Sequence, residues 1–326
     1  MTKYIIRRLL LIPLALVVVL TLTYAYAHLV QWDYAARYPQ LRQQLQRAQR
    51  PESLTEAYLD YAGGLLRLDF GRLRNGQSVS VVVWQALLAS LGLLAAALLL
   101  SVPLGVLLGM LGAQWRRLRP ARWLVVLSTA GLAMPSFYVG SLLILLSIAS
   151  LLLRRVDGTL LFPLAGFGWD RHMVLPLVAL SVRPTVHIAQ VTSTLLTGEL
   201  QKPYVAAARS MGHSRKRVKQ RLAFRNILAP VALTIATSLR TLVADLILVE
   251  SLFFWPGVGR FTATALIPAS RTNMMNSPYL LHPELLAALL AIVTLIFLIA
   301  DFVTSISVRI FDPRLRVAVQ GEVGNV

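Results

Sequence analysis

The sequence contains no cysteine, few charged residues and only 14 acidic ones. Without cysteine the chain cannot form disulfide bonds, thiolate metal sites or cysteine nucleophiles. Charged residues make up 14% of the chain, whereas an ordinary soluble domain has about 25%. Hydrophobic residues make up 56% of the 326 residues. A soluble fold of this length could not bury so much apolar surface, so the composition predicts an integral membrane protein.

Motifs for nucleotide and metal chemistry are also missing. The P-loop pattern G-x-x-x-x-G-K-[ST] does not occur, and neither does the zinc pattern H-E-x-x-H. No two carboxylates are paired at short spacing, and the five histidines are scattered along the chain: His28, His172, His187, His213 and His282. These absences speak against a membrane enzyme acting on lipid or cell-wall intermediates. We therefore expect no enzymatic activity, no metal site and no cofactor in this chain.

Long apolar segments occur about six times. A helix needs about 20 apolar residues to cross hydrocarbon about 30 Å thick. The segments cover residues 4–29, 81–111, 123–153, 173–196, 227–254 and 284–310. The first of them has a basic start and an Ala25-Tyr26-Ala27 run that resembles a signal-peptide cleavage site, but its length favours a retained helix. We predict an all-α membrane protein with about six transmembrane helices.

The net charge of +18 would suggest nucleic-acid binding in a soluble protein, but here basic residues flank membrane spans. The loop 199–226 alone holds eight of them: Lys202, Arg209, Arg215, Lys216, Arg217, Lys219, Arg221 and Arg225. The positive-inside rule therefore predicts that both termini are cytoplasmic. Residues 1–30 are then the first span, 31–80 an external polar segment, 81–316 a membrane core of five spans, and 317–326 a cytoplasmic tail.

The stretch YVAAARSMGHSRKRVKQRLAFRNILAP, residues 204–230, predicts two short helices outside the membrane. Residues 205–209 are strong helix formers, and Gly212 would end that helix by adopting a left-handed conformation. Ser214 is a suitable N-cap for a second helix over residues 216–224. A solvated charge run would satisfy the positive-inside rule by itself. The alanine cluster, the glycine and the following basic helix make a more specific signal.

This stretch resembles the cytoplasmic coupling loop of binding-protein-dependent ABC import permeases, in their dipeptide/oligopeptide/nickel branch. The alanine pair, glycine, Arg-Asn pair and proline of that loop are matched by Ala207, Ala208, Gly212, Arg225, Asn226 and Pro230. The general motif opens with glutamate, where this chain has Ala206. The runs YIIRRLLLIPLALVVVL, YAGGLLRLDFGRLRNG, VESLFFWPGVGR and Asp312-Pro313-Arg314 are similar to the same branch. Residues 31–58 and 268–283 match it poorly.

The resemblance implies a type I importer permease in a bacterial or archaeal inner membrane, surrounded by lipid. Such a permease pairs with a second permease, often a paralogue, with two cytoplasmic ATPases that bind ATP and Mg²⁺, and with an external solute-binding protein. It implies import of peptides or similar small solutes. The short helix would dock on an ATPase, and the residues assigned to this coupling are Ala207, Ala208, Arg209 and Gly212.

Polar residues within the spans suggest a translocation path, because ionisable groups in a membrane are costly and usually face a cavity or a partner. The candidates are Arg183, His187 and Asp245; Arg240, Glu250 and Asp301 complete the set. Interhelical pairing is the alternative explanation for these residues. Arg183 and His187 are four residues apart and share one helix face, and the proline between them would disturb the helix.

A rigid external turn is predicted after the fifth span, at Trp255, Pro256, Gly257 and Gly259. The turn could act as an external gate, or its aromatic residue could serve only as an interfacial anchor. One further class of transporter stays open at this point. An ion-coupled secondary transporter would use the carboxylates within the spans and need no ATPase, but it predicts inverted repeats, and none is visible in the sequence.

Overall fold

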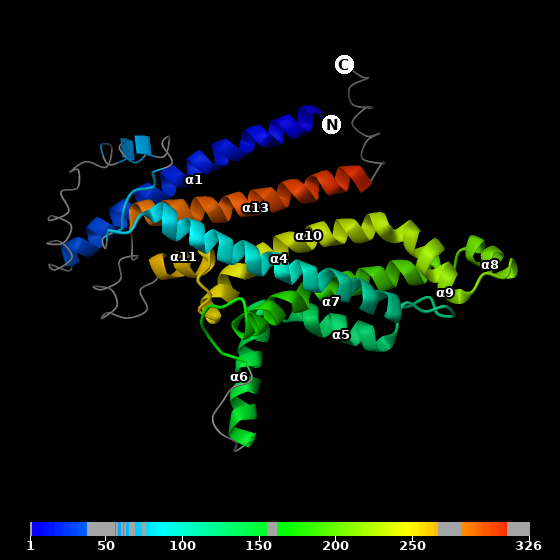
Figure 1. Ribbon diagram of the computed structural model, residues 1–326. Helices are drawn as coiled ribbons and strands as arrows, with labels where there is room; N and C mark the ends of the chain where they lie inside the picture. Colours follow the sequence, from blue (N-terminus) through cyan, green and yellow to red (C-terminus); the bar gives the residue numbers. More distant parts are fainter. Residues whose placement is uncertain are drawn as a thin grey trace. The chain divides into compact units, whose positions relative to one another are not determined.

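The computed structural model describes residues 2–37, 56, 58, 59, 61, 63, 64, 69–73, 76–154, 162–266 and 282–311. Within these ranges the regular elements are helices, and one isolated antiparallel bridge joins Arg72 to Ser78. The long helices are α1 (Thr2–Arg37), α4 (Val79–Gly112), α5 (Arg122–Ala133), α6 (Ser136–Arg154), α7 (Val174–Glu199), α10 (Phe224–Leu252) and α13 (Pro283–Phe311) (Figure 1). The predictions made for residues 38–55, 268–281 and 312–326 lie outside the described residues.

Among the described residues, six helical segments are long and apolar enough to cross a membrane, in agreement with the predicted number of spans. They lie in α1, α4, α6, α7, α10 and α13. Helices are the expected solution because a bilayer offers the backbone no hydrogen-bond partners, so each segment must satisfy its own N–H and C=O groups. α1 continues to Arg37, past the predicted end of the first span.

The third predicted span was wrong in one respect, because residues 123–153 do not form a single helix. The chain breaks at Met134 and Pro135, between α5 and α6. Met134 has φ −91° and ψ 120°, an extended conformation. The proline ring disfavours the α conformation in the residue before it, which favours a break at this point. α6 is therefore the spanning helix, and α5 is a separate apolar helix of 12 residues.

The chain divides into two compact units built from interleaved segments. Unit 1 comprises Met1–Gly92, Ala165–Phe167 and Phe253–Leu298, and unit 2 comprises Leu93–Leu164, Gly168–Leu252 and Ile299–Val326. The N-terminal part of α4 and most of α13 belong to unit 1, and their remaining residues belong to unit 2.

Unit 1 has its core where the start of α4 meets α13 and the short helix α11 (Val258–Leu266). The buried side chains of this cluster are Leu73, Val79, Val82, Val83, Ala86, Val258, Leu285, Ala288 and Leu289. A second cluster holds α1, because the Tyr24 ring stacks on Tyr61 with centroids 4.7 Å apart. The Tyr58 hydroxyl lies 2.7 Å from that of Thr21 and adds a polar contact to the same helix.

Unit 2 is organised around α7, which packs against α10, α6 and α5. Two glycines of α4 allow an especially close approach to α7. A Cβ atom added at Gly105 would lie 2.8 Å from the Cβ of Ile188, and one added at Gly109 would lie 2.6 Å from the Cβ of Thr192. These glycines are four residues apart, the spacing by which small residues bring membrane helices together.

Replacing Gly109 with alanine should destabilise unit 2, since the new methyl group would also lie 2.7 Å from the carbonyl oxygen of Ala189. Overpacking of this kind costs about 1–3 kcal/mol. Thermal unfolding of the purified chain in detergent would measure the effect. Gly198→Ala is the matched control, because that helical glycine has nothing within 4 Å of its added Cβ. Equal unfolding temperatures for Gly109→Ala and Gly198→Ala would contradict the close packing.

Candidate functional site

The loop of residues 199–226, called the basic loop below, contains a short helix, α8 (Pro203–Ser210). Pro203 occupies the first helical turn, where its missing N–H costs nothing. The helix ends at Ser210 with Met211 as its C-cap, and Gly212 follows with φ +86°. Glycine adopts this left-handed conformation without steric cost. The predicted helix and the predicted break at Gly212 are therefore both present.

The second half of the basic loop differs from its prediction. Ser214 is an N-cap as expected, and its side-chain oxygen accepts a hydrogen bond from the Arg217 N–H at 3.3 Å. The helix that starts there does not stay short. It runs through α9 (Arg215–Arg217) and a π-helical segment, η2 (Val218–Ala223), directly into α10. No glycine or proline lies between Ser214 and Phe224 to stop it, so only the first helix of the loop is a separate element.

α8 has a buried and an exposed face. Val205 and Ala208 are buried, and they pack with Val218, Trp115 and Tyr204. Ala208 was assigned to ATPase coupling, but its side chain faces the interior of this chain, so its contribution to any docking surface is indirect. The docking role of the four assigned residues stays a prediction.

The exposed face of α8 and the turn after it offer a surface to a partner. Its residues are Ala206, Ala207, Arg209, Ser210, Met211 and Gly212. The Arg209 guanidinium donates to the His213 carbonyl oxygen at 2.8 Å and so holds the turn closed. Met211 is 73% exposed, and the sequence reasoning missed it. A methionine beside a helix-ending glycine was the available signal.

The end of α4 is fastened to the basic loop. The Lys219 ammonium donates to the Ala113 carbonyl oxygen at 3.0 Å, and the Gln201 amide donates to the Trp115 carbonyl oxygen at 3.0 Å. Both accepting residues lie just beyond Gly112, so these bonds hold the connection that follows α4 against the basic loop. The Trp115 side chain also packs in two apolar clusters of unit 2. One contains Val205, Ala208 and Val218, and the other includes Leu196 and Ile227. The ends of α4, α7 and α10 therefore meet at the basic loop (Figure 1).

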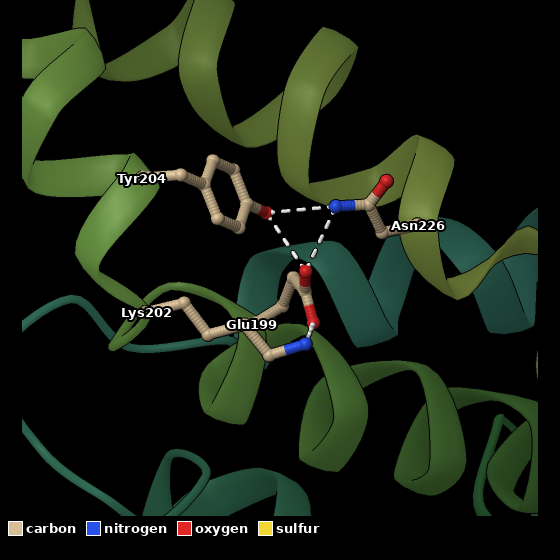
Figure 2. A network of polar contacts seen from close by, with 4 residues as sticks. All are labelled: Glu199, Lys202, Tyr204 and Asn226. Carbon is tan, nitrogen blue, oxygen red and sulfur yellow. Dashed lines mark hydrogen bonds and ion pairs between the residues drawn. The ribbon is translucent and has the colours of Figure 1, made fainter.

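A polar network joins α7, α8 and α10 (Figure 2). Glu199, the last residue of α7, accepts hydrogen bonds on one carboxylate oxygen from the Tyr204 hydroxyl and the Asn226 amide, both at 2.9 Å. Its other oxygen lies 2.6 Å from the Lys202 ammonium. The Asn226 amide also donates to the Tyr204 hydroxyl at 3.1 Å. The sequence reasoning missed this network, because the partners come from three elements.

Within the spans, α7 and α10 are linked by charge. Arg183 Nη1 lies 3.6 Å from Asp245 Oδ2, and the Ser136 hydroxyl donates to the same oxygen at 2.6 Å. The His187 ring nitrogen Nδ1 lies 3.4 Å from the Ser238 hydroxyl. Arg183 and His187 therefore both reach toward α10, as their spacing predicted. α7 is continuous through Pro184.

A second intramembrane ion pair links α10 to α13. Arg240 Nη2 lies 2.9 Å from Asp301 Oδ1, and both side chains are partly exposed. The Thr304 hydroxyl adds a bond of 2.8 Å to the Ala236 carbonyl oxygen of α10. α10 supplies the acidic residue of one ion pair and the basic residue of the other. Ion pairing between helices therefore accounts for four of the charged residues within the spans.

The turn after α10 is packed rather than open. Trp255 is fully buried, and its indole N–H donates to the Ala89 carbonyl oxygen at 3.0 Å. The Val258 N–H donates to the Ser90 hydroxyl at 2.8 Å. Gly257 and Gly259 are buried, and Pro256 is partly so. The predicted rigid turn is present, and its function as a gate stays a prediction.

Phe254, one residue before this turn, adopts a strained backbone conformation with φ +55°. A non-glycine residue in this region costs energy and persists only where its surroundings hold it. Arg260 does so here, because its Nη1 donates to the Phe254 carbonyl oxygen at 2.6 Å and its guanidinium lies 5.0 Å from the ring centroid. Burial lowers the pKa of Arg260 below its usual value.

No group of three or more His, Cys, Asp or Glu side chains in the described part of the chain could hold a metal ion. What the structure does assemble is a set of six apolar spans with ion pairs inside them, and a short helix tied to the ends of three spans. This is the architecture of a polytopic α-helical membrane protein.

The chain belongs to the family of binding-protein-dependent transport system inner membrane components, whose sequence pattern matches residues 101–317. It is 31% identical to the di/tripeptide transport system permease protein DppB of Pseudomonas aeruginosa, over 81% of each chain. It is 28% identical to the dipeptide transport system permease protein DppB of Escherichia coli K12, over 97% of this chain and 99% of that protein. It is 26% identical to the oligopeptide permease OppB of Mycobacterium bovis, over 98% and 100%.

These relatives confirm the predicted importer permease of the ABC class and the branch that the sequence resembled. The family favours it over the ion-coupled transporter, because its members are components of binding-protein-dependent transport systems. The chain is accordingly a membrane subunit of a transporter.

The Arg183–Asp245 pair can be tested by a double-mutant cycle. Arg183→Gln and Asp245→Asn should each lower the thermal stability of the purified chain, because each leaves a charge without its partner. The double variant should lose less stability than the two single variants added together, with a coupling free energy on the order of 1 kcal/mol. Additive losses in thermal unfolding would show that the two side chains do not interact.

Trp255→Phe tests whether the indole hydrogen bond stabilises this turn. Loss of the indole donor to Ala89 should lower the stability of the chain by about 1 kcal/mol, measured as the unfolding temperature in detergent. Trp84→Phe is the matched control, since Trp84 also belongs to unit 1 and is 60% exposed. An unchanged unfolding temperature for Trp255→Phe would show that the indole hydrogen bond contributes little to the stability of the turn.

Proposed function

We propose that this chain is one permease half of an ATP-driven importer of peptides or similar small solutes. Its membership of the permease family carries the proposal. The solute class rests on the relatives, which are named as di/tripeptide, dipeptide and oligopeptide permeases and align over most of their length. A second permease subunit, a paralogue, would complete the pair, and an external solute-binding protein would deliver the solute.

Energy would come from two cytoplasmic ATPase subunits, which bind ATP and Mg²⁺. The chain has no P-loop pattern of its own. The exposed face of α8 supports the basic loop as the docking element, because small side chains at Ala206 and Ala207 allow close approach of a partner and Arg209 adds a charge. Gly212 directs the chain out of the helix through its positive φ.

The basic loop then lies on the cytoplasmic face, and both termini lie on the same side. The eight basic residues of the loop support this orientation. The location would be the inner membrane of a bacterium or archaeon. Arg183, His187 and Asp245 would border the solute path, and the turn of Trp255, Pro256, Gly257 and Gly259 would lie at the external end of it.

Gly212→Asp tests the coupling assignment. Any side chain is strained at φ +86°, although an added Cβ would meet nothing within 4 Å, so the substitution should alter the turn and its charge without a clash. The tagged chain, extracted in mild detergent from its native host, should recover a second permease and P-loop ATPases. The Gly212→Asp variant should lose most of the ATPases and keep the second permease.

Gly76→Asp is the matched control for this experiment. Gly76 has φ +85° and equally open surroundings, but it lies outside the basic loop. It should therefore retain the ATPases. Full recovery of ATPases with Gly212→Asp would place the docking surface elsewhere, and recovery of a lone wild-type chain would overturn the proposed function itself.

A further inference from the structure

The Glu199 carboxylate, at the end of α7, accepts the hydrogen bonds that tie this helix to α8 through Tyr204 and to α10 through Asn226 (Figure 2). Its side chain is 8% exposed. A buried carboxylate is costly unless it is paired and hydrogen-bonded. Hydrogen bonds to a charged acceptor are about twice as strong as neutral ones. The arrangement therefore favours one position of Tyr204 and Asn226 around this carboxylate.

The Tyr204 hydroxyl is a permanent donor in this network. Burial, together with its hydrogen bond to Glu199, raises the pKa of Tyr204 to about 12. A phenol with a raised pKa keeps its proton until the pH approaches that value, so the hydroxyl donates at every physiological pH. The Tyr204–Glu199 bond consequently does not switch with pH in the cell.

α8 depends on these bonds because it has little else to hold its orientation. It has only eight residues, and isolated helices of fewer than about 12 residues are marginal in water. Lys202 at its N-cap makes no capping hydrogen bond with its side chain. Its buried face consists of Val205 and Ala208. A short helix with so small an apolar contact can pivot unless polar bonds fix it.

The connection from α7 to α8 is short, since only residues 200–202 lie between Glu199 and Pro203. α7 and α10 are themselves packed along their length, and the Leu196, Leu200, Ala223, Ile227 and Val231 side chains form their shared core at this end. A force applied to α8 can therefore reach both spans, provided that α8 does not pivot on its own.

We infer that Glu199 is a positioning residue that clamps α8 to α7 and α10 at once, so that a displacement of α8 moves both spans as one body. This inference rests on the proposed function for the source of the displacement, which is the ATPase. The clamp itself is a property of this chain. Lys202 is a minor part of it, because its side chain is 56% exposed and exposed ion pairs contribute little.

The absence of cysteine makes the clamp measurable by pulsed electron paramagnetic resonance. Spin labels at Ser210→Cys, Thr194→Cys and Leu228→Cys would report on α8, α7 and α10, since all three residues are exposed. The labels are used in pairs. The α8–α7 and α8–α10 distances follow the clamp, and the α7–α10 distance reports whether the spans stay packed. The unlabelled transporter, purified the same way, gives the background.

Glu199→Ala should broaden both α8 distances and leave the α7–α10 distance unchanged. We expect the fraction of molecules whose α8 distances fall outside the wild-type range to rise roughly tenfold, which is within the range of typical coupling effects. Glu199→Gln should restore the wild-type distances, because its amide oxygen can accept from Tyr204 and Asn226. Lys202→Gln should also resemble wild type.

Two results would overturn the clamp: wild-type α8 distances in Glu199→Ala, or broadening of all three distances, which would show a general loss of packing. Failure of the proposed function looks different, because no ATPase would then co-purify with the wild-type chain. The nucleotide-free distances would still test the clamp in that case.

Discussion

Backbone hydrogen bonding is the constraint on which the structure depends, because lipid offers no partner to an N–H or C=O group. It accounts for the six long helices. It also accounts for what happens where a helix must stop. At Pro135 the chain leaves the helical conformation one residue early. Just after α4, Lys219 and Gln201 supply donors to the Ala113 and Trp115 carbonyl groups. Side chains from the basic loop thus hold the connection that follows this span.

Helix packing then follows from small residues and from charge. Gly105 and Gly109 bring the backbone of α4 close to α7, where a methyl group would not fit. α10 is fixed on two sides, by Asp245 toward α7 and by Arg240 toward α13. Charges within a membrane are expensive unless they are paired. The structure pairs four of them between spans, so Arg183 and Asp245, which could border a solute path, also hold the bundle together.

In the basic loop, both hydrogen bonds and apolar packing hold the chain in place. α8 is anchored by two apolar side chains and by the Glu199 network, and it presents small and basic residues outward. A loop that docks on a moving partner must be held rigidly against its own spans and must expose a surface to the partner. The division of α8 into a buried and an exposed face meets both requirements, and it explains why Ala207 and Ala208, which are adjacent in sequence, have different surroundings.

The sequence by itself determined the membrane class, the number of spans, the break at Gly212 and the family, because apolar length, charge distribution and local motifs are properties of neighbouring residues. Only the tertiary structure decided which side chains meet. The contact of Glu199 with Asn226 joins residues 27 positions apart, and that of Arg183 with Asp245 depends on how α7 and α10 pack. The burial of Ala208 could not be predicted from the sequence either, because it depends on contacts with Trp115 and Val218, which lie elsewhere in the chain.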